Sequence, residues 1–338
     1  MRWELCAGRS HLRCRRAWAG GAAATGVVLA LTGAAAGQTD ESLLLKPWEG
    51  SRIIEAEAQT IWMPRSAPAG SVGLSTLIDT TSDGRVRLST EHELNPTIGY
   101  EFTRLQVRDR EGRVPNGLID VSGAVASPLF TFGPTDAWFL GARAGVGYAG
   151  DEAFGNSDAW YGKGSVSVGR ELAKDEDIIF WLDYDGNRTF FPDIPLPHIA
   201  YVREVSEQFS FVLGLPDSAL SWKPTRGLYV EVNWQAPFSF DATVTQSLGG
   251  GLKVFAGYHD VTEAFHLESL RSEDRLFYNA NRLEAGVRYD LSVGWSIDAG
   301  VGYGFGQSLK TGFSQFGWET LAHLPDRPYL RFGATLAF

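Results

Sequence analysis

The sequence predicts an all-β protein, an antiparallel transmembrane β-barrel of about 14 strands, with 12 as the alternative. In the last ten residues, 329–338, apolar side chains alternate with small or polar ones. Other segments show the same alternation over about 9–11 residues, the length with which a tilted strand crosses a bilayer. Short turns and long loops also alternate along the chain, which is typical of outer-membrane barrels.

The C-terminal strand ends on a free phenylalanine. Because chain ends usually fray in water, an aromatic last residue is unusual for a soluble protein. The pattern formed by Arg331, Gly333, Leu336 and Phe338 resembles the C-terminal signal of outer-membrane β-barrels. This resemblance implies that the four residues form an assembly signal and that the barrel-assembly machinery is a partner.

Further segments with this alternation, 138–148, 228–235, 283–290 and 295–305, have aromatic residues on their apolar faces. In two of these segments the aromatic residues span ten positions, or roughly 25 Å along the membrane normal at the usual tilt. A soluble β-sandwich also alternates, but its strands are usually shorter. The predicted membrane-interface aromatics are Trp138, Tyr148, Trp234, Tyr289, Trp295, Tyr303 and Phe305.

The opposite faces of the predicted strands carry charges of both signs. In one interpretation they line a water-filled pore, where an acidic excess favours cations. In the other they pair across the lumen and close it, because an unpaired charge in a narrow, dry interior is costly. The predicted pore-lining residues are Glu55, Glu57, Glu101, Asp120, Arg143, Lys163, Asp183, Glu231, Lys253, Glu284, Arg288, Asp298 and Arg331.

Residues 1–37 are predicted to be a cleaved secretory signal peptide, because arginines precede a small apolar run that ends in Ala and Gly. Residues 38–50 are expected to be a periplasmic segment and residues 51–338 the barrel. The two cysteines, Cys6 and Cys14, precede the apolar run, so the exported chain is expected to lack disulfides and thiolate metal sites. These features predict location in the outer membrane of a Gram-negative bacterium, with lipid as a partner.

A family resemblance adds to the fold prediction. Residues 213–216 read Leu-Gly-Leu-Pro, Trp222 stands two positions before Pro224, and residues 283–289 read Leu-Glu-Ala-Gly-Val-Arg-Tyr. These motifs resemble a bacterial family of outer-membrane β-barrels known only as a domain of unknown function. The resemblance covers roughly residues 50–338 and implies the fold but no substrate.

Two motifs match known binding loops by their letters alone. Residues 145–150 read G-x-G-x-x-G, but an acidic loop follows them where a dinucleotide site needs a helix. Residues 183–187 resemble the start of a calcium loop, but Ile194 stands where that loop needs an acidic residue. We therefore expect no cofactor and no metal. The net charge of −10 also argues against a nucleic-acid partner.

His259 and His266 are the candidates for a membrane hydrolase, with Glu263 and Glu268 close in sequence. The sequence contains no G-x-S-x-G nucleophile elbow. We therefore expect no catalytic residue and no enzymatic activity, and a lipid hydrolase is the less favoured alternative.

The predicted function is a porin-like channel for transport of small polar solutes or ions, with loops 187–206, 260–279 and 306–327 as constriction elements. The second hypothesis is a non-conducting barrel whose external loops bind a surface partner or ligand. The aromatic residues that this hypothesis assigns to the contact are Phe190, Phe191, Phe313, Phe316 and Trp318.

Overall fold

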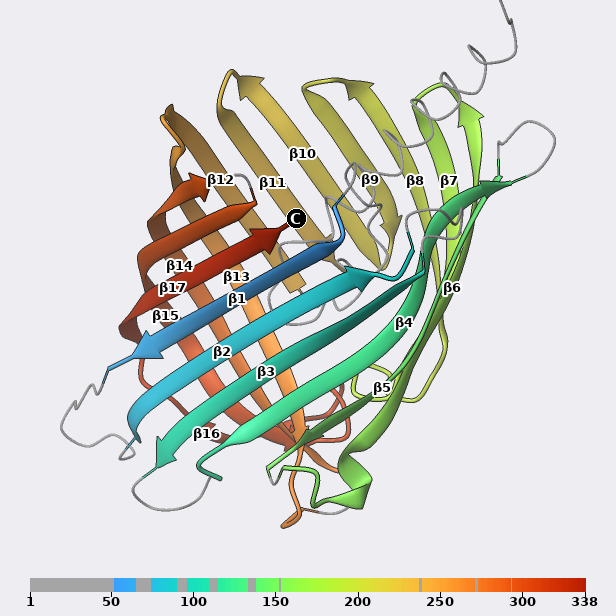
Figure 1. Ribbon diagram of the computed structural model, residues 1–338. Helices are drawn as coiled ribbons and strands as arrows, with labels where there is room; N and C mark the ends of the chain where they lie inside the picture. The colour runs from blue at the N-terminus through green and yellow to red at the C-terminus, as the bar shows by residue number, and fades with distance from the viewer. Residues whose placement is uncertain are drawn as a thin grey trace, which may run out of the picture.

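The computed structural model describes residues 52–64, 74–89, 96–109, 115–132, 138–151, 153–236, 239–270, 273–292 and 294–338. These residues form one antiparallel sheet of 17 strands (Figure 1). Strand β16 pairs only with β15, and the other 16 strands close into a barrel. The strands are β1 (Ile54–Met63), β2 (Leu74–Arg87), β3 (Thr97–Asp109), β4 (Leu118–Phe132), β5 (Trp138–Gly150), β6 (Trp160–Ala173), β7 (Glu176–Asp185), β8 (Leu196–Ser206), β9 (Phe209–Leu215), β10 (Asp217–Thr225), β11 (Leu228–Gln235), β12 (Ser239–Gly249), β13 (Leu252–His266), β14 (Arg275–Ser292), β15 (Trp295–Gly312), β16 (Glu319–His323) and β17 (Arg327–Ala337).

The described residues contain one short helical element, the 3-10 helix η1 (Ser157–Ala159), between β5 and β6. None of the helical residues in the described part of the chain forms a helix suited to crossing a bilayer. The predicted signal peptide and the predicted periplasmic segment lie outside the described residues.

The last strand of the chain closes the barrel. β17 pairs antiparallel with β1, in a register that runs from Glu55 opposite Ala337 to Trp62 opposite Leu330. Beyond this ladder, the Ile54 amide donates to the Phe338 carbonyl at 3.0 Å, and the Phe338 amide donates to the Ile54 carbonyl at 2.8 Å. The predicted C-terminal strand is therefore confirmed, and its backbone satisfies the edge that β1 would otherwise expose. We call the end of the barrel that carries Phe338 the C-terminal rim, and the opposite end the loop rim.

The barrel has 16 strands where the sequence predicted about 14. The difference arises in the region 196–225, which the sequence analysis treated as the end of a loop followed by one strand. The structure divides it into β8, β9 and β10. The turns between them are short, two residues at Glu207–Gln208 and the single residue Pro216, and neither contains a glycine. Pro216 is a turn signal in the sequence, whereas the Glu207–Gln208 turn contains neither glycine nor proline and gave little signal.

The outer face of the barrel is apolar along the length of the strands. In β15, for example, Trp295, Ile297, Val301 and Tyr303 are all exposed, while Asp298 between them is buried. Both rims carry exposed aromatic side chains, with Trp138, Trp222, Tyr289, Trp295 and Phe338 near the C-terminal rim and Trp62, Trp160, Trp234 and Tyr303 nearer the loop rim. This distribution matches the lipid-facing band of a membrane barrel.

Two of the predicted interface aromatics are less exposed than the others. Tyr148 is 1% exposed, because Phe154 and Trp160 pack over its ring at centroid distances of 5.1 and 5.3 Å. Phe305 is half-buried. The exposed aromatic surface near Tyr148 is therefore supplied by its two covering neighbours, which local alternation could not predict.

Glycines on the inner face make room for aromatic rings from the neighbouring strand. Gly302 of β15 stands directly opposite Tyr329 of β17, and a Cβ at this glycine would overlap the tyrosine ring. Gly147 and Gly169 accommodate the rings of Tyr161 and Phe139 in the same way. The rings lie flat along the wall over these glycines, an arrangement known from other sheets in which an aromatic ring covers a glycine.

Replacing Gly302 with alanine is expected to destabilise the barrel by about 1–3 kcal/mol, because the new methyl group displaces the buried Tyr329 ring. Gly123→Ala is the matched control, since its Cβ would meet only a backbone oxygen at 3.9 Å. Urea unfolding of the refolded barrel, followed by heat-dependent gel mobility, measures both variants. Equal midpoints for the two variants would contradict the packing argument.

Candidate functional site

Charged side chains on the inner face form a chain of ion pairs over β13, β14, β15 and β17. Arg331 contacts Glu284 at 2.5 Å and lies 3.6 Å from Asp298. Asp298 also faces Arg288 at 3.5 Å, and Lys253 pairs with an aspartate of β14 at 2.9 Å. Arg288 and Asp298 stand directly opposite one another in register, whereas the Arg331 side chain reaches past β15 to Glu284 on β14.

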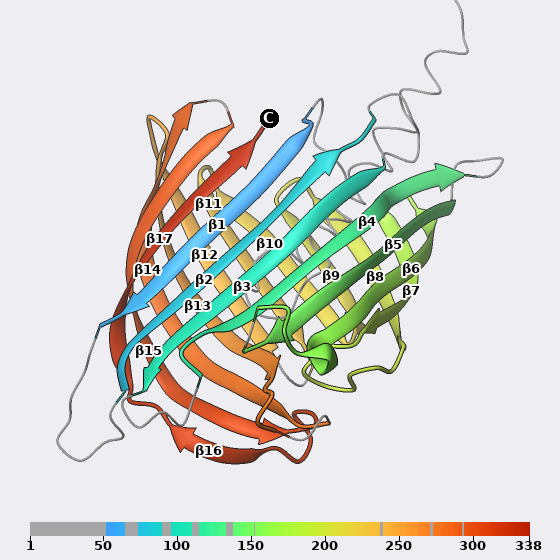
Figure 2. The same ribbon diagram turned by 60° about the horizontal axis from the view of Figure 1, so that its bottom comes forward.

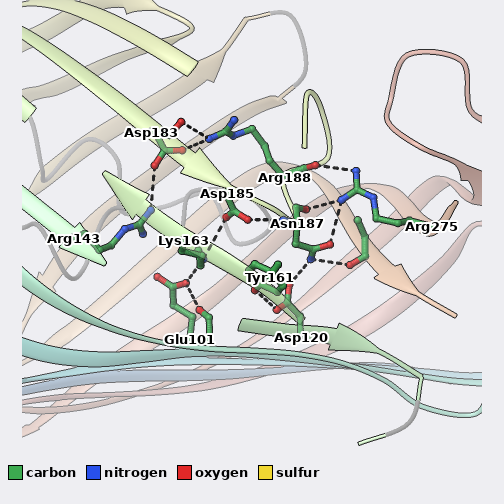
Figure 3. Close-up of polar contacts among 12 residues, drawn as sticks. Glu101, Asp120, Arg143, Tyr161, Lys163, Asp183, Asp185, Asn187, Arg188 and Arg275 are labelled. Carbon is green, nitrogen blue, oxygen red and sulfur yellow. Dashed lines mark hydrogen bonds and ion pairs between the residues drawn. The ribbon is translucent and has the colours of Figure 1, made fainter. Parts of the chain in front are cut away.

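A second group of ion pairs lies on β3 to β7 (Figure 3). Lys163 contacts Glu101 at 2.6 Å and lies 3.6 Å from Asp185. Asp183 accepts from Arg143 at 3.3 Å and is also paired with Arg188 from the loop after β7. The side chains of both groups are mostly buried. Water and salt therefore screen these pairs less than they screen surface ion pairs.

The predicted lining residues all lie on strands, in the phase opposite to the exposed apolar side chains. Glu55 is held by Arg85 at 2.6 Å, Asp120 accepts from Tyr161 at 2.6 Å, and Glu231 is half-buried. Glu57 differs from the rest, because its side chain is exposed on the inner side of β1. That the predicted lining residues contact a continuous water path remains a prediction.

One ion pair joins distant parts of the wall. Arg282 of β14 donates to Asp79 of β2 at 2.6 Å, and both side chains are almost completely buried. Neither residue was among the predicted lining residues. Arg282 stands two positions before Glu284 and therefore continues its inward phase, but no local pattern indicates a partner 203 residues away.

His259 lies in the first ion-pair group and not in a catalytic arrangement. Its Nδ1 is 2.5 Å from Asp241, and its Nε2 is 3.2 Å from Glu284. With both ring nitrogens bound to carboxylates, neither is available to activate a hydroxyl nucleophile. His266 ends the same strand, β13, at the loop rim. Among the described residues, no cluster of His, Cys, Asp and Glu is suited to hold a metal ion.

The end of β13 crosses the loop rim and reaches the opposite wall. His266 forms a parallel backbone bridge with Gly150 at the end of β5. In Figures 1 and 2 the ends of β14 and β15, with β16, curve over this rim. The bridge divides the loop rim into one half bounded by β13–β17 and β1–β5, and another bounded by β5–β13.

An apolar cluster fills the first half of the loop rim. Its largest members are Met63, Phe265, Tyr278 and Tyr329, each at most 1% exposed, and it draws residues from both sides of the barrel. The cluster lies on the inner face, where the sequence analysis expected only charged and small residues. Its other members are Ile61, Leu77, Leu105, Val107, Leu118, Leu267, Leu276, Ala280, Leu309 and Leu324.

A polar cap holds the loops together over the rim (Figure 3). We define the cap as loop 186–195, loop 313–318 and the adjoining ends of β13 and β14. At its centre, the Asn187 amide donates to Asp120 of the wall at 2.9 Å and to the Ala264 carbonyl at 3.0 Å. Arg275 donates to the Asn187 carbonyl at 2.9 Å and to the Phe313 carbonyl at 2.8 Å. These bonds tie two loops and two strand ends to the barrel wall.

Loops 187–206, 260–279 and 306–327 were the predicted constriction elements. Parts of all three take part in the cap, through Asn187, Ala264, Arg275 and Phe313. The structure assigns much of these ranges to strands, since β8, β13, β14 and β15 all extend into them. The sequence analysis thus located the segments but did not identify Asn187 and Arg275, whose contacts join residues 88 positions apart.

No protein-family model and no curated protein matches the sequence. Among solved structures, the chain is similar to an outer membrane channel from Pseudomonas putida F1, with TM-score 0.37 and 10% identity over 87% of this chain and 98% of that chain. It is also similar to the Pseudomonas putida toluene transporter TodX, with TM-score 0.39 and 8% identity over 91% of this chain and 96% of that chain. Likeness at this level says nothing about a solute.

Proposed function

We propose that this chain is an outer-membrane β-barrel that forms a porin-like channel for diffusion of small polar solutes or ions. The observation that carries the proposal is the division of the closed wall into an apolar outer face and a charged inner face. An apolar outer face favours lipid contact, and a closed barrel leaves no unpaired strand edge in the hydrocarbon. Charged inner side chains are stable where water or opposite charges surround them.

The solute path is proposed to follow the half of the barrel bounded by β5–β13, because the apolar cluster fills the other half of the loop rim. Loop 186–195 lies over this path and is held by Asn187 and Arg275. The cap then acts as the constriction, and its release opens the channel. Since most inner carboxylates are ion-paired, the ion selectivity of the wall is expected to be weak.

The first test is single-channel conductance of the refolded chain in a planar bilayer. Stepwise currents are expected, and Glu57→Gln and Glu231→Gln are expected to lower the preference for cations by about twofold or less, because each removes one inward negative charge. Glu207→Gln, at an exposed turn of the C-terminal rim, is the control. Silence from a barrel with normal heat-dependent gel mobility would contradict the channel function.

The second candidate function is binding of a surface partner by the external loops. One observation favours it: Phe191 and Phe316, from two separate loops, are both exposed and their ring centroids lie 4.9 Å apart. Phe313 is also exposed, whereas Phe190 is 3% exposed and Trp318 is covered by Lys310 at 3.7 Å from its ring centroid. Loss of surface binding in Phe191→Ser with unchanged conductance would support this function.

A further inference from the structure

Arg327 lies on the inner face at the start of β17, and its side chain is completely buried. Its backbone pairs with Gly304 of β15. None of its three guanidinium nitrogens has a hydrogen-bond partner among the residues that the structure describes. A guanidinium is always charged in proteins, so this site holds a buried positive charge without an acceptor.

The other buried arginines of the interior differ from Arg327 in this respect. Arg282 has Asp79, Arg331 has Glu284, and Arg275 donates to backbone carbonyls. The carboxylate next to Arg327 in sequence, Asp326, accepts from the Gly306 amide at 2.9 Å instead. Among the described buried arginines, Arg327 is therefore the one whose three guanidinium nitrogens all have no acceptor.

Polar groups stand beside the site as well. Gln307 donates to the carbonyl of Pro325, two residues before Arg327, at 2.9 Å. The Tyr278 hydroxyl donates to the same glutamine at 3.0 Å. Both side chains are buried, so the guanidinium does not stand in purely apolar surroundings.

We propose that Arg327 binds the carboxylate or phosphate group of a small anionic solute at the loop rim. A buried, uncompensated charge strongly destabilises a fold, and an anion that enters the site removes that penalty. The planar guanidinium matches carboxylate and phosphate in a bidentate geometry. The inference does not rest on the proposed function, because Arg327 lies in the half of the loop rim that the apolar cluster fills, away from the proposed solute path.

The proposal is tested by isothermal titration of inorganic phosphate into the chain refolded in detergent. The wild-type protein is expected to bind phosphate, and Arg327→Met is expected to weaken binding by about tenfold or more, because it removes the charged hydrogen-bond donors of the site. Arg327→Lys is expected to retain part of the affinity. Arg203→Met is the matched control, since Arg203 is exposed near the C-terminal rim.

Thermal unfolding supplies a second measurement that a purely structural role would not reproduce. In phosphate-free buffer, Arg327→Met is expected to be at least as stable as the wild type, because methionine removes the buried charge. Added phosphate is expected to raise the unfolding temperature of the wild type only. Equal phosphate affinity in the two proteins, or an Arg327→Met variant that is less stable at every phosphate concentration, would overturn the proposal.

These measurements separate the anion site from the channel. A barrel that binds phosphate through Arg327 but carries no current would disprove the proposed function and leave the anion site standing. A barrel that conducts and shows no phosphate binding would disprove the anion site alone.

Discussion

Replacing Asn187 with alanine is expected to increase the open probability and the steady conductance of the channel. The Asn187 side chain joins the cap to the wall through Asp120 and to β13 through the Ala264 carbonyl, and it also accepts from Arg275 at 3.2 Å. Loss of these bonds is expected to weaken the capped state by about 2 kcal/mol, or roughly thirtyfold in the ratio of closed to open barrels.

The measurement is the open probability in single-channel recordings of wild type and variant under the same salt conditions. Asn281→Ala is the matched control, because Asn281 makes one side-chain bond, from the Tyr258 hydroxyl, at a distance from the cap. A structural effect on the whole barrel would change the gel mobility of the folded form, and the cap effect would not. Identical recordings from wild type and Asn187→Ala would show that the cap is not the constriction.

Replacing Asp79 with alanine is expected to destabilise the barrel by about 3–5 kcal/mol, the largest single effect that the interior predicts. Asp79 and Arg282 are both almost fully buried, at 2% and 3% side-chain exposure, so the variant removes the carboxylate that Arg282 contacts and leaves the buried Glu263 as its nearby counter-charge. The pair also connects β2 to β14 across the interior, and this contact is lost in the variant. Urea unfolding of the refolded barrel measures the change.

Replacing Asp79 with leucine, Arg282 with methionine and Glu263 with glutamine together is expected to recover most of this loss, because the buried charges around Arg282 are then removed at the same time. Glu176→Ala is the surface control. Its partner Arg203 is 48% exposed at 3.4 Å, and the change is expected to cost less than about 1 kcal/mol. An Asp79→Ala variant as stable as Glu176→Ala would show that the buried pair contributes little.

Features of the wall that depend on local alternation were predictable from the sequence. The side chains of β15 from Trp295 to Tyr303 and the closing strand that ends at Phe338 appear in the structure as expected, since a two-residue period is a local property of the chain. The same alternation placed Glu284 and Arg331 on the inner face, where they meet at 2.5 Å.

Sequence patterns did not predict turns that lack a typical turn residue or contacts between residues far apart in the chain. The division of 196–225 into three strands depends on turns without glycine, and so the strand count was too low by two. The inner apolar cluster was missed because Met63 and Leu77 stand in the phase that elsewhere carries charges, and because Leu309 turns inward only after the irregularity between β14 and β15. Alternation identifies two faces, but it does not say which contacts a curved wall brings together.

The sequence by itself determined the fold class, the closing role of the last strand and the charged character of the inner face, because each follows from neighbours along one strand. The tertiary structure decided which charges pair, where Asn187 and Arg275 hold the cap, and that Arg327 has no acceptor among the described residues. These depend on strand register and on the inward curvature of β13 to β15, which bring together residues far apart in the chain. Such long-range placement is set by packing of the whole barrel and leaves no local pattern.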